Sequence, residues 1–173
     1  VVVQNMRPGL MERYGLGADE LCARFPRLIF CNLGAFGEIG PLSAHTGYDP
    51  LVQAFSGIMS VTGEPGRPPV RVGPSIIDQG SGMWCVIGIL SALLERSRTG
   101  QGCRVDTSLF ETGLSWMTVP VANALASGRE PGKSGSETPM LAPYRAFGAS
   151  DRPVVIAAGN NNLFRRLTET MGH

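Results

Sequence analysis

The sequence is poor in the residues that build metal sites and that transfer protons near neutral pH. Its 173 residues include two histidines, His45 and His173, and four cysteines that form no Cys-x-x-Cys pair. Zinc sites gather such residues at short spacings, so the sequence predicts no bound metal. A Gly-x-Ser-x-Gly nucleophile elbow is absent, and Gly132-Lys133-Ser134 lacks the paired glycine and buried strand of a phosphate loop. These absences argue against zinc enzymes, serine hydrolases of that type and P-loop enzymes.

Charge is sparse as well. Charged residues make up 17% of the chain, the net charge is +1, and Lys133 is the single lysine. No cluster of four or more basic residues occurs, so we expect binding neither to nucleic acid nor to a membrane surface. The longest apolar run, from about residue 83 to 94, is too short to cross a bilayer. The cysteines at 22, 31, 85 and 103 lie in or beside apolar segments, which is typical of reduced thiols in a cytoplasmic protein.

What the sequence does contain is an alternation of apolar strands and helices. The predicted strands are residues 1–4, 27–33 and 103–109, and the predicted longer helices are residues 49–61, 79–98 and 110–127. Such alternation is typical of an α/β domain with a parallel sheet. We therefore expect residues 1–127 to be part of a large α/β domain. Residues 128–139, rich in Gly, Ser, Glu and Pro, are the expected linker, and residues 140–173 the start of a smaller α+β domain.

Asp78 is the candidate catalytic residue that the local pattern singles out. It follows the apolar run 74–77, predicted as a strand, and precedes a glycine-rich turn at 79–82 that opens a long apolar helix. The structural alternative is a helix N-cap, because Asp at that position satisfies free backbone N–H groups. The two roles are compatible, since the helix dipole favours the ionised carboxylate and Gly80 and Gly82 let a substrate approach. The N–H groups of residues 79–82 are then candidate donors to an oxyanion.

The motifs around Asp78 resemble those of the family III CoA-transferases, the CaiB/BaiF group. In chain order they are Asn5-Met6-Arg7-Pro8-Gly9, Gly15-Leu16-Gly17, Pro26-Arg27-Leu28-Ile29-Phe30, Gly47-Tyr48-Asp49 with the following eight residues to Gly57, Arg96-Ser97-Arg98-Thr99-Gly100-Gln101-Gly102, and Val105-Asp106-Thr107-Ser108-Leu109. The resemblance covers nearly the whole chain. It implies a Rossmann-like large domain, an interlocked homodimer, and an internal fragment of a chain more than twice as long.

The resemblance also implies roles for individual residues. Asp78 takes the place of the catalytic aspartate, 30 positions after Tyr48, which lines the CoA and acyl site. Asn5, Met6, Arg7 and Arg13 match positions that contact the nucleotide part of CoA in members resembling formyl-CoA transferase, and arginine suits its phosphates. Asp49 belongs to the same CoA-binding set, although as a residue it is better explained as the N-cap of its own helix. Read alone, Arg7 and Arg13 are solvated helix charges and Tyr48 is a surface residue.

The expected activity is CoA transfer between an acyl-CoA thioester and a free carboxylic acid, through an aspartyl mixed anhydride and an aspartyl-CoA thioester. This chemistry uses coenzyme A and needs no metal or redox cofactor. A glycine-rich loop near residues 132–135 covers the intermediate in some such enzymes. The racemases of the same family are an alternative. The resemblance implies that they have a Gly-His-Asp motif where this chain has Gly47-Tyr48-Asp49, and a glutamate near residues 160–162, which are asparagines here. A catalytically inactive CoA-binding or dimerisation module is the other alternative.

Overall fold

The computed structural model describes residues 1–172, and it places a parallel three-stranded sheet at the centre of the first three-quarters of the chain. Strand β1 (Val2–Gln4), strand β2 (Phe30–Gly34) and strand β3 (Arg104–Ser108) lie in the order β1-β2-β3. Val3 pairs with Cys31, and Cys31 pairs with Val105. The middle strand is the buried one, with Phe30 and Cys31 almost fully covered. This confirms the expected α/β class and parallel sheet.

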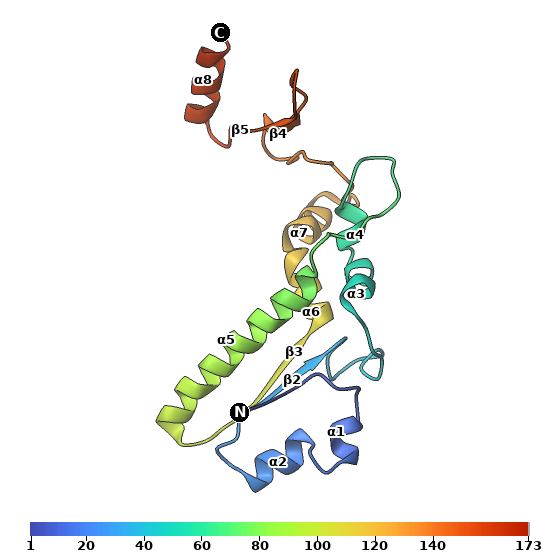
Figure 1. Cartoon of the computed structure of the whole chain (residues 1–173), viewed down its shortest axis with the longest axis vertical. Helices are drawn as coiled ribbons and strands as arrows, with labels where there is room; N and C mark the ends of the chain where they lie inside the picture. Colours follow the sequence, from blue (N-terminus) through green and yellow to red (C-terminus); the bar gives the residue numbers. More distant parts are fainter. Residues whose placement is uncertain (173) are drawn as a thin grey trace.

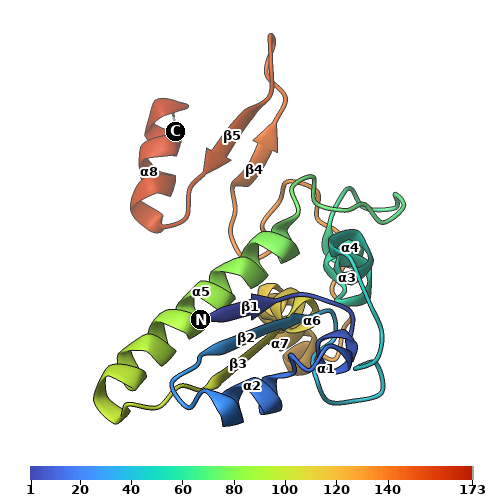
Figure 2. The ribbon, with the colours of Figure 1, turned by 60° about the horizontal axis from the view of Figure 1, so that its bottom comes forward.

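Helices connect and cover the strands (Figure 1). Helices α1 (Leu10–Arg13) and α2 (Ala18–Arg24) lie between β1 and β2; α3 (Asp49–Phe55), α4 (Ile58–Val61) and α5 (Ile76–Thr99) lie between β2 and β3; α6 (Leu109–Trp116) and α7 (Thr118–Ser127) follow β3. The long helix α5 runs along one side of the sheet, with α1 and α2 on the other side (Figure 2). His173 lies outside the described residues.

Two of the expected helices are each divided in two. The helix predicted at 49–61 breaks at Gly57, whose φ of 89° is a left-handed conformation that ends α3. The helix predicted at 110–127 breaks at Met117, which ends α6 and precedes α7. Pro120 in α7 has no N–H to bond to the carbonyl four residues earlier, so the hydrogen-bond ladder cannot run unbroken through this point.

The core lies where α3, α5 and α6 meet beyond the ends of the strands. Its buried residues are Val52, Ile58, Ile77, Leu109 and Met117. Two glycines allow the helices to come close: a Cβ on Gly80 would lie 2.9 Å from Thr112 Cγ2, and one on Gly113 would lie 2.7 Å from Ser56 Cβ. The expectation that Gly80 opens the backbone to a substrate is therefore wrong, because the space beside it is filled by α6. No atom lies within 4 Å of a Cβ built on Gly82.

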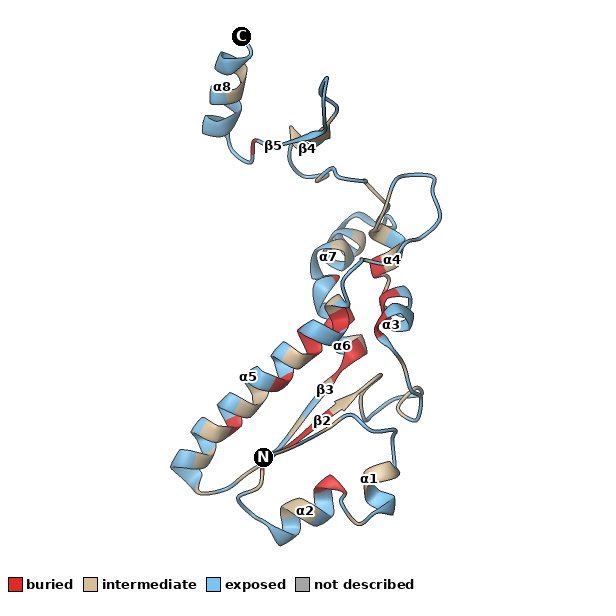
Figure 3. Ribbon diagram, viewed as in Figure 1, coloured by how far each residue is buried: buried red, intermediate tan, exposed pale blue. Residues whose placement is uncertain are grey.

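Much of α5 is exposed, as the pale blue segments of Figure 3 show, and its exposed residues include large apolar ones. Met83, Ile87, Leu90 and Leu94 follow one another at spacings of four, three and four residues, which places them on one face of the helix. By length and composition alone, the 24 residues of α5 would suffice to cross a bilayer, with 28% of the most apolar window buried inside the protein. The core helix of a soluble protein meets the same criterion, and the inner face of α5 packs on β3, β2 and α6.

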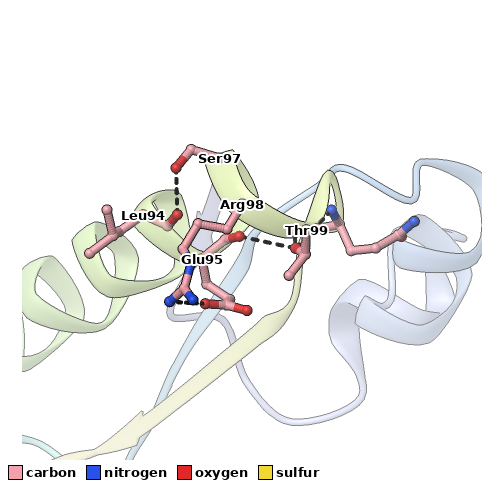
Figure 4. Close-up of polar contacts among 6 residues, drawn as sticks. Leu94, Glu95, Ser97, Arg98 and Thr99 are labelled. Carbon is pink, nitrogen blue, oxygen red and sulfur yellow. Dashed lines mark hydrogen bonds and ion pairs between the residues drawn. The ribbon is translucent and has the colours of Figure 1, made fainter.

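The C-terminal end of α5 is held by contacts among neighbouring residues (Figure 4). Thr99 Oγ1 donates to the carbonyl of Glu95 at 3.0 Å, and Arg98 lies 3.8 Å from the carboxylate of Glu95. Gly100 has a φ of 75° and closes the helix through its N–H, which donates to the carbonyl of Arg96. Gly100 is therefore a glycine C-cap, and it lies two residues beyond the predicted helical range of 79–98.

The last elements form a separate small sheet. Strands β4 (Tyr144–Phe147) and β5 (Val154–Ala157) pair antiparallel and are followed by helix α8 (Asn161–Thr170). Figures 1 and 2 show this hairpin and helix standing apart from the parallel sheet. The boundaries of the linker and of the second domain stay predictions.

Candidate functional site

A cavity of about 480 Å³ opens at the carboxyl end of the parallel sheet. Residues that follow β1 line it together with residues that follow β2, and Asp78 lies among them; the lining is Asn5, Met6, Arg7, Pro8, Leu33, Gly34, Ala35, His45, Thr46, Gly47, Tyr48, Asp78 and Leu109. Ligands of open α/β sheets bind at this end, because the loops after the parallel strands converge there. We take this cavity as the candidate site.

A row of polar side chains fixes the loop that carries Asn5 and Arg7. The Gln4 side-chain amide donates to Asn32, and Asn32 in turn donates to Glu38. Glu38 forms an ion pair with Arg104 at 2.7 Å, which links the row across all three strands. Gln4 Oε1 also accepts a hydrogen bond of 2.7 Å from the N–H of Met6. This row was not among the predicted features, although polar residues near the ends of otherwise apolar strands were a signal for it.

Asp78 lies in the first turn of α5, three residues after the N-cap Ser75. Both local expectations were therefore wrong: residues 76 and 77 are helical rather than strand, and Asp78 is not the N-cap. Its side chain is exposed toward the cavity and, among residues 1–172, makes no hydrogen bond or ion pair. Partial burial, and then the negative charge of Asp49, raise the pKa of Asp78 above its ordinary value.

Asp49 does not cap its own helix but the first turn of α5. Its Oδ2 accepts hydrogen bonds from the N–H of Ile77 at 2.8 Å and from the N–H of Asp78 at 3.1 Å. Its Oδ1 accepts one from Gln53 Nε2 at 2.6 Å, and Gln53 Oε1 accepts one from the N–H of Val72 at 2.8 Å. Asp49 and Gln53 are 2% and 0% exposed. The expectation that Asp49 is the N-cap of α3 is wrong, because Tyr48 has that position.

The same contacts overturn the expected oxyanion donors. The N–H of Gln79 donates to the carbonyl of Ser75 at 3.1 Å, and residues 80–82 lie inside the helix, where each N–H bonds to the carbonyl four residues earlier. Only the N–H groups before Gln79 lack such partners, and Asp49 binds those of Ile77 and Asp78. The start of α5 therefore has no free N–H group to offer an oxyanion at these positions.

The structure brings most of the predicted site residues together. Asn5, Met6, Arg7, Tyr48 and Asp78 line one cavity, although they come from three separate parts of the sequence. A smaller cavity of about 230 Å³ adjoins it and shares Met6, Arg7 and Pro8. Of the residues that the structure describes, Arg13 and Asp49 are absent from both linings: Arg13 is exposed at the end of α1, and Asp49 is buried.

Two further positions differ from the sequence-based picture. His45, for which the sequence pattern predicts no role in the site, lines the cavity with Asp78. The segment at 132–135 does not line it: the N–H of Gly135 donates to the carbonyl of Gly63 at 3.0 Å, and Lys133 donates to the carbonyl of Arg67. Within residues 1–172, no group of three or more His, Cys, Asp or Glu side chains is arranged to hold a metal ion.

Comparison with known proteins assigns this arrangement to a family. The sequence matches the family described as CoA-transferase family III over residues 1–173. It is 42% identical to an acetyl-CoA:oxalate CoA-transferase of Acetobacter aceti, over 99% of this chain and 44% of that protein. It is 35% identical to a succinate–glutarate CoA-transferase of Agrobacterium fabrum, over 99% of this chain and 43% of that protein.

Solved structures give the same result. A CAIB/BAIF family protein from Brucella suis superposes with a TM-score of 0.85 and 38% sequence identity, over 99% of this chain and 45% of that one. A Mycobacterium tuberculosis protein superposes with a TM-score of 0.85 and 28% identity, over 99% of this chain and 46% of that one. The chain thus spans a little under half the length of these relatives.

Proposed function

This chain belongs to CoA-transferase family III, and we propose that the protein moves CoA between an acyl-CoA thioester and a free carboxylic acid, with Asp78 as the nucleophile. One observation carries the proposal: an accessible carboxylate, with no hydrogen bond or ion pair among residues 1–172, lies in a cavity with Asn5, Arg7 and Tyr48. A carboxylate can take up and release an acyl group without a metal or an external base. The CoA-transferase names of the relatives support the same reaction class.

The first half of the proposed reaction transfers the acyl group and then CoA to Asp78. A carboxylate oxygen of Asp78 attacks the thioester carbonyl, the C–S bond breaks, and CoA leaves as a thiolate. This gives a mixed anhydride between Asp78 and the donor acid. The thiolate, still bound, attacks the carboxyl carbon of Asp78 and releases the donor as a carboxylate. The product is an aspartyl-CoA thioester, and no net proton is gained or lost.

The second half runs the same steps with the acceptor. A carboxylate oxygen of the acceptor attacks the aspartyl thioester and releases CoA thiolate, which gives a second mixed anhydride. The thiolate attacks the acyl carbon of the acceptor, and Asp78 leaves as a free carboxylate. Splitting the exchange in this way keeps each step between acyl derivatives of similar bond type.

One cationic and one amide side chain in the cavity suit these ligands. Arg7 can clamp phosphate oxygens of CoA in a bidentate way, and Asn5 offers an amide for hydrogen bonds. The relatives named above use oxalate, succinate or glutarate, which are dicarboxylic acids. We propose acids of this class as the first candidates for donor and acceptor, tested with a panel of CoA thioesters and free dicarboxylates.

The test of the proposed function is covalent labelling of Asp78. The full-length protein incubated with acyl-CoA and then with hydroxylamine should carry one modified residue, and mass spectrometry should locate it at Asp78. Asp78→Asn should lower turnover at least about 10³-fold while CoA binding persists. Asp19→Asn is the matched control, because Asp19 is an exposed aspartate in the first turn of α2. Full turnover in an Asp78→Asn protein whose mass excludes deamidation would refute the proposal.

A racemase is the second candidate, and one observation favours it. His45 lines the same cavity as Asp78, so the site holds two groups able to move protons. Two other positions do not supply that chemistry. Tyr48 stands where the racemases have a histidine. Asn160 stands near the position of their glutamate, and it is the N-cap of α8, accepting a 2.9 Å hydrogen bond from the N–H of Leu163. Exchange of an α-proton of a 2-methylacyl-CoA with deuterated solvent would identify this activity, and His45→Ala should then abolish it.

We also propose that the protein is a homodimer whose interface includes the exposed face of α5. Met83, Ile87, Leu90 and Leu94 present a continuous apolar strip that is unfavourable in water. Burial of this strip against a second copy would remove it from solvent. Sedimentation of the full-length protein should give a dimer, and Leu90→Arg should shift it toward monomer; an unchanged dimer would remove α5 from the interface.

A further inference from the structure

We infer that Asp49 and Gln53 are positioning residues for Asp78: together they clamp the first turn of α5 to α3 and to the connector that precedes α5. The inference rests on the proposed function, in which Asp78 is the nucleophile. Neither residue lines the cavities described above, so neither is assigned contact with substrate. Their effect on the reaction passes through the place and the charge of Asp78.

The orientation of the Gln53 amide is determined by its two partners. Its Oε1 accepts from the N–H of Val72 at 2.8 Å, and an amide that accepts with its oxygen must turn its NH₂ group the other way. That NH₂ group meets Asp49 Oδ1 at 2.6 Å. Rotation of the amide by half a turn would bring two oxygens together and two N–H groups together. Gln53 therefore serves as a directional link between Val72 and Asp49.

Asp49 uses its other oxygen on the backbone that carries Asp78. It accepts hydrogen bonds from the N–H groups of Ile77 and Asp78. Both groups belong to the first helical turn, where no carbonyl of the same helix is available to them. A shift of α3 or of the connector at Val72 would then move this turn, because all three segments are joined by hydrogen bonds through the buried side chains of Asp49 and Gln53. A displacement of about 1 Å at a reacting group can cost about 100-fold in rate.

The second contribution of Asp49 is electrostatic. Its negative charge, after partial burial, raises the pKa of Asp78. The other titratable or charged side chains that face Asp78 from the cavity wall are Arg7, His45 and Tyr48. Because Asp78 must be ionised to attack, a raised pKa moves the acidic limb of the rate profile to higher pH. Removal of the Asp49 charge should move that limb to lower pH.

The first experiment changes Gln53 in the full-length protein. Gln53→Met keeps the length of the side chain but removes both hydrogen bonds, so kcat should fall about 10- to 100-fold while KM for acyl-CoA stays within about twofold. Gln101→Met is the matched control, because Gln101 follows the opposite, exposed end of α5. It should leave both constants unchanged.

Gln53→Glu tests the hydrogen-bond pattern within one folded preparation. A protonated glutamate can still accept from Val72 and donate to Asp49, whereas an ionised one sets two carboxylates against each other. The ratio of variant to wild-type kcat should therefore rise as the pH falls. If Gln53→Met does not fold, this pH series tests the positioning inference by itself. A ratio of variant to wild-type kcat that does not change with pH would overturn the inference.

Asp49→Asn tests the charge. It replaces one acceptor oxygen by an NH₂ group, so it breaks one arm of the clamp and removes the negative charge; kcat should fall, and the acidic limb should move to lower pH. If Asp78→Asn abolishes turnover but the Gln53 and Asp49 variants keep wild-type kcat and pH dependence, the positioning inference fails and the proposed function stands. If Asp78→Asn retains turnover, both fail.

Discussion

The two ends of α5 are held in different ways. At the C-terminal end, Thr99, Arg98 and Gly100 all interact with residues three to four positions earlier in the same helix. Two exposed hydrogen bonds with Arg27 add to these: its guanidinium donates to the carbonyl of Gly100 at 3.3 Å, and its own carbonyl accepts from Arg96 at 3.0 Å. At the N-terminal end, Ile77 and Asp78 donate to Asp49, 28 and 29 positions away in sequence. Most of the buried residues of α5 lie in its N-terminal half, and none lies in its last two turns (Figure 3).

The difference indicates why the candidate nucleophile lies where it does. The cap at the C-terminal end is made within the helix itself, and the hydrogen bonds that Arg27 adds there are exposed to solvent. An end held by a buried carboxylate from another helix depends on that helix being in place. Asp78 lies at the end that is capped by a buried residue of another helix, so its position and its charge respond to α3 and to the connector at Val72.

The largest expected effect on stability comes from removing the clamp. Asp49→Ala leaves two backbone N–H groups and the Gln53 amide without a partner in the interior, so the free energy of unfolding should fall by about 3–5 kcal/mol. Urea denaturation of the full-length protein measures it. Asp19→Ala, at an exposed first-turn aspartate of α2, should cost less than about 1 kcal/mol. Equal losses for the two variants would mean that the start of α5 is held locally.

The next effect concerns the packing behind the same end. Gly113→Ala puts a Cβ 2.7 Å from Ser56 Cβ and 3.3 Å from Ile77 Cδ1, so it should destabilise by about 1–3 kcal/mol. Gly82→Ala is the matched control within α5, where the new methyl group meets no atom within 4 Å. It should stabilise by about 0.5–1 kcal/mol, because alanine favours the helix. Thermal unfolding of both variants provides the comparison, and the same sign for both would contradict the packing described here.

At the C-terminal end of α5, we expect a smaller loss of stability that is confined to the helix cap. Gly100 has a φ of 75°, which an alanine adopts at a cost of about 1–2 kcal/mol. Gly100→Ala should therefore lower the unfolding free energy by about that amount and leave kcat unchanged, since the strain lies at the far end of α5 from Asp78. A fall in kcat without a matching fall in stability would show that the two ends communicate.

The smallest effect should come from the ion pair between Glu95 and Arg98. Both side chains are more than half exposed and lie 3.8 Å apart, so Glu95→Gln should cost less than about 0.5 kcal/mol. The loss should vanish in 1 M salt, where the charges are screened. Denaturation at low and high salt checks this prediction, and a loss that persists at high salt would point to a contact other than the ion pair.

The sequence by itself determined the features that depend on short-range patterns. The order of strands and helices, the parallel sheet that this order favours, and the end of α5 at Gly100 follow from apolar periodicity and from glycine chemistry within a few residues. Motif order along the chain also singled out Asn5, Arg7, Tyr48 and Asp78, which the fold brings to one cavity. Those signals are carried by the chain itself and do not depend on which helix packs where.

Only the tertiary structure decided what each side chain of the site binds. Asp49 has the sequence context of a cap for α3, yet it caps α5; Gly80 looked open to a substrate, yet α6 fills the space beside it; and His45 had no local motif to mark it. Helix α5 begins at Ile76 rather than at the predicted residue 79, and the N–H groups of its first turn find their acceptor, Asp49, on another helix. Hydrogen bonds and close packing between segments about 30 residues apart depend on where those segments meet in space, and residue spacing along the chain does not contain that information.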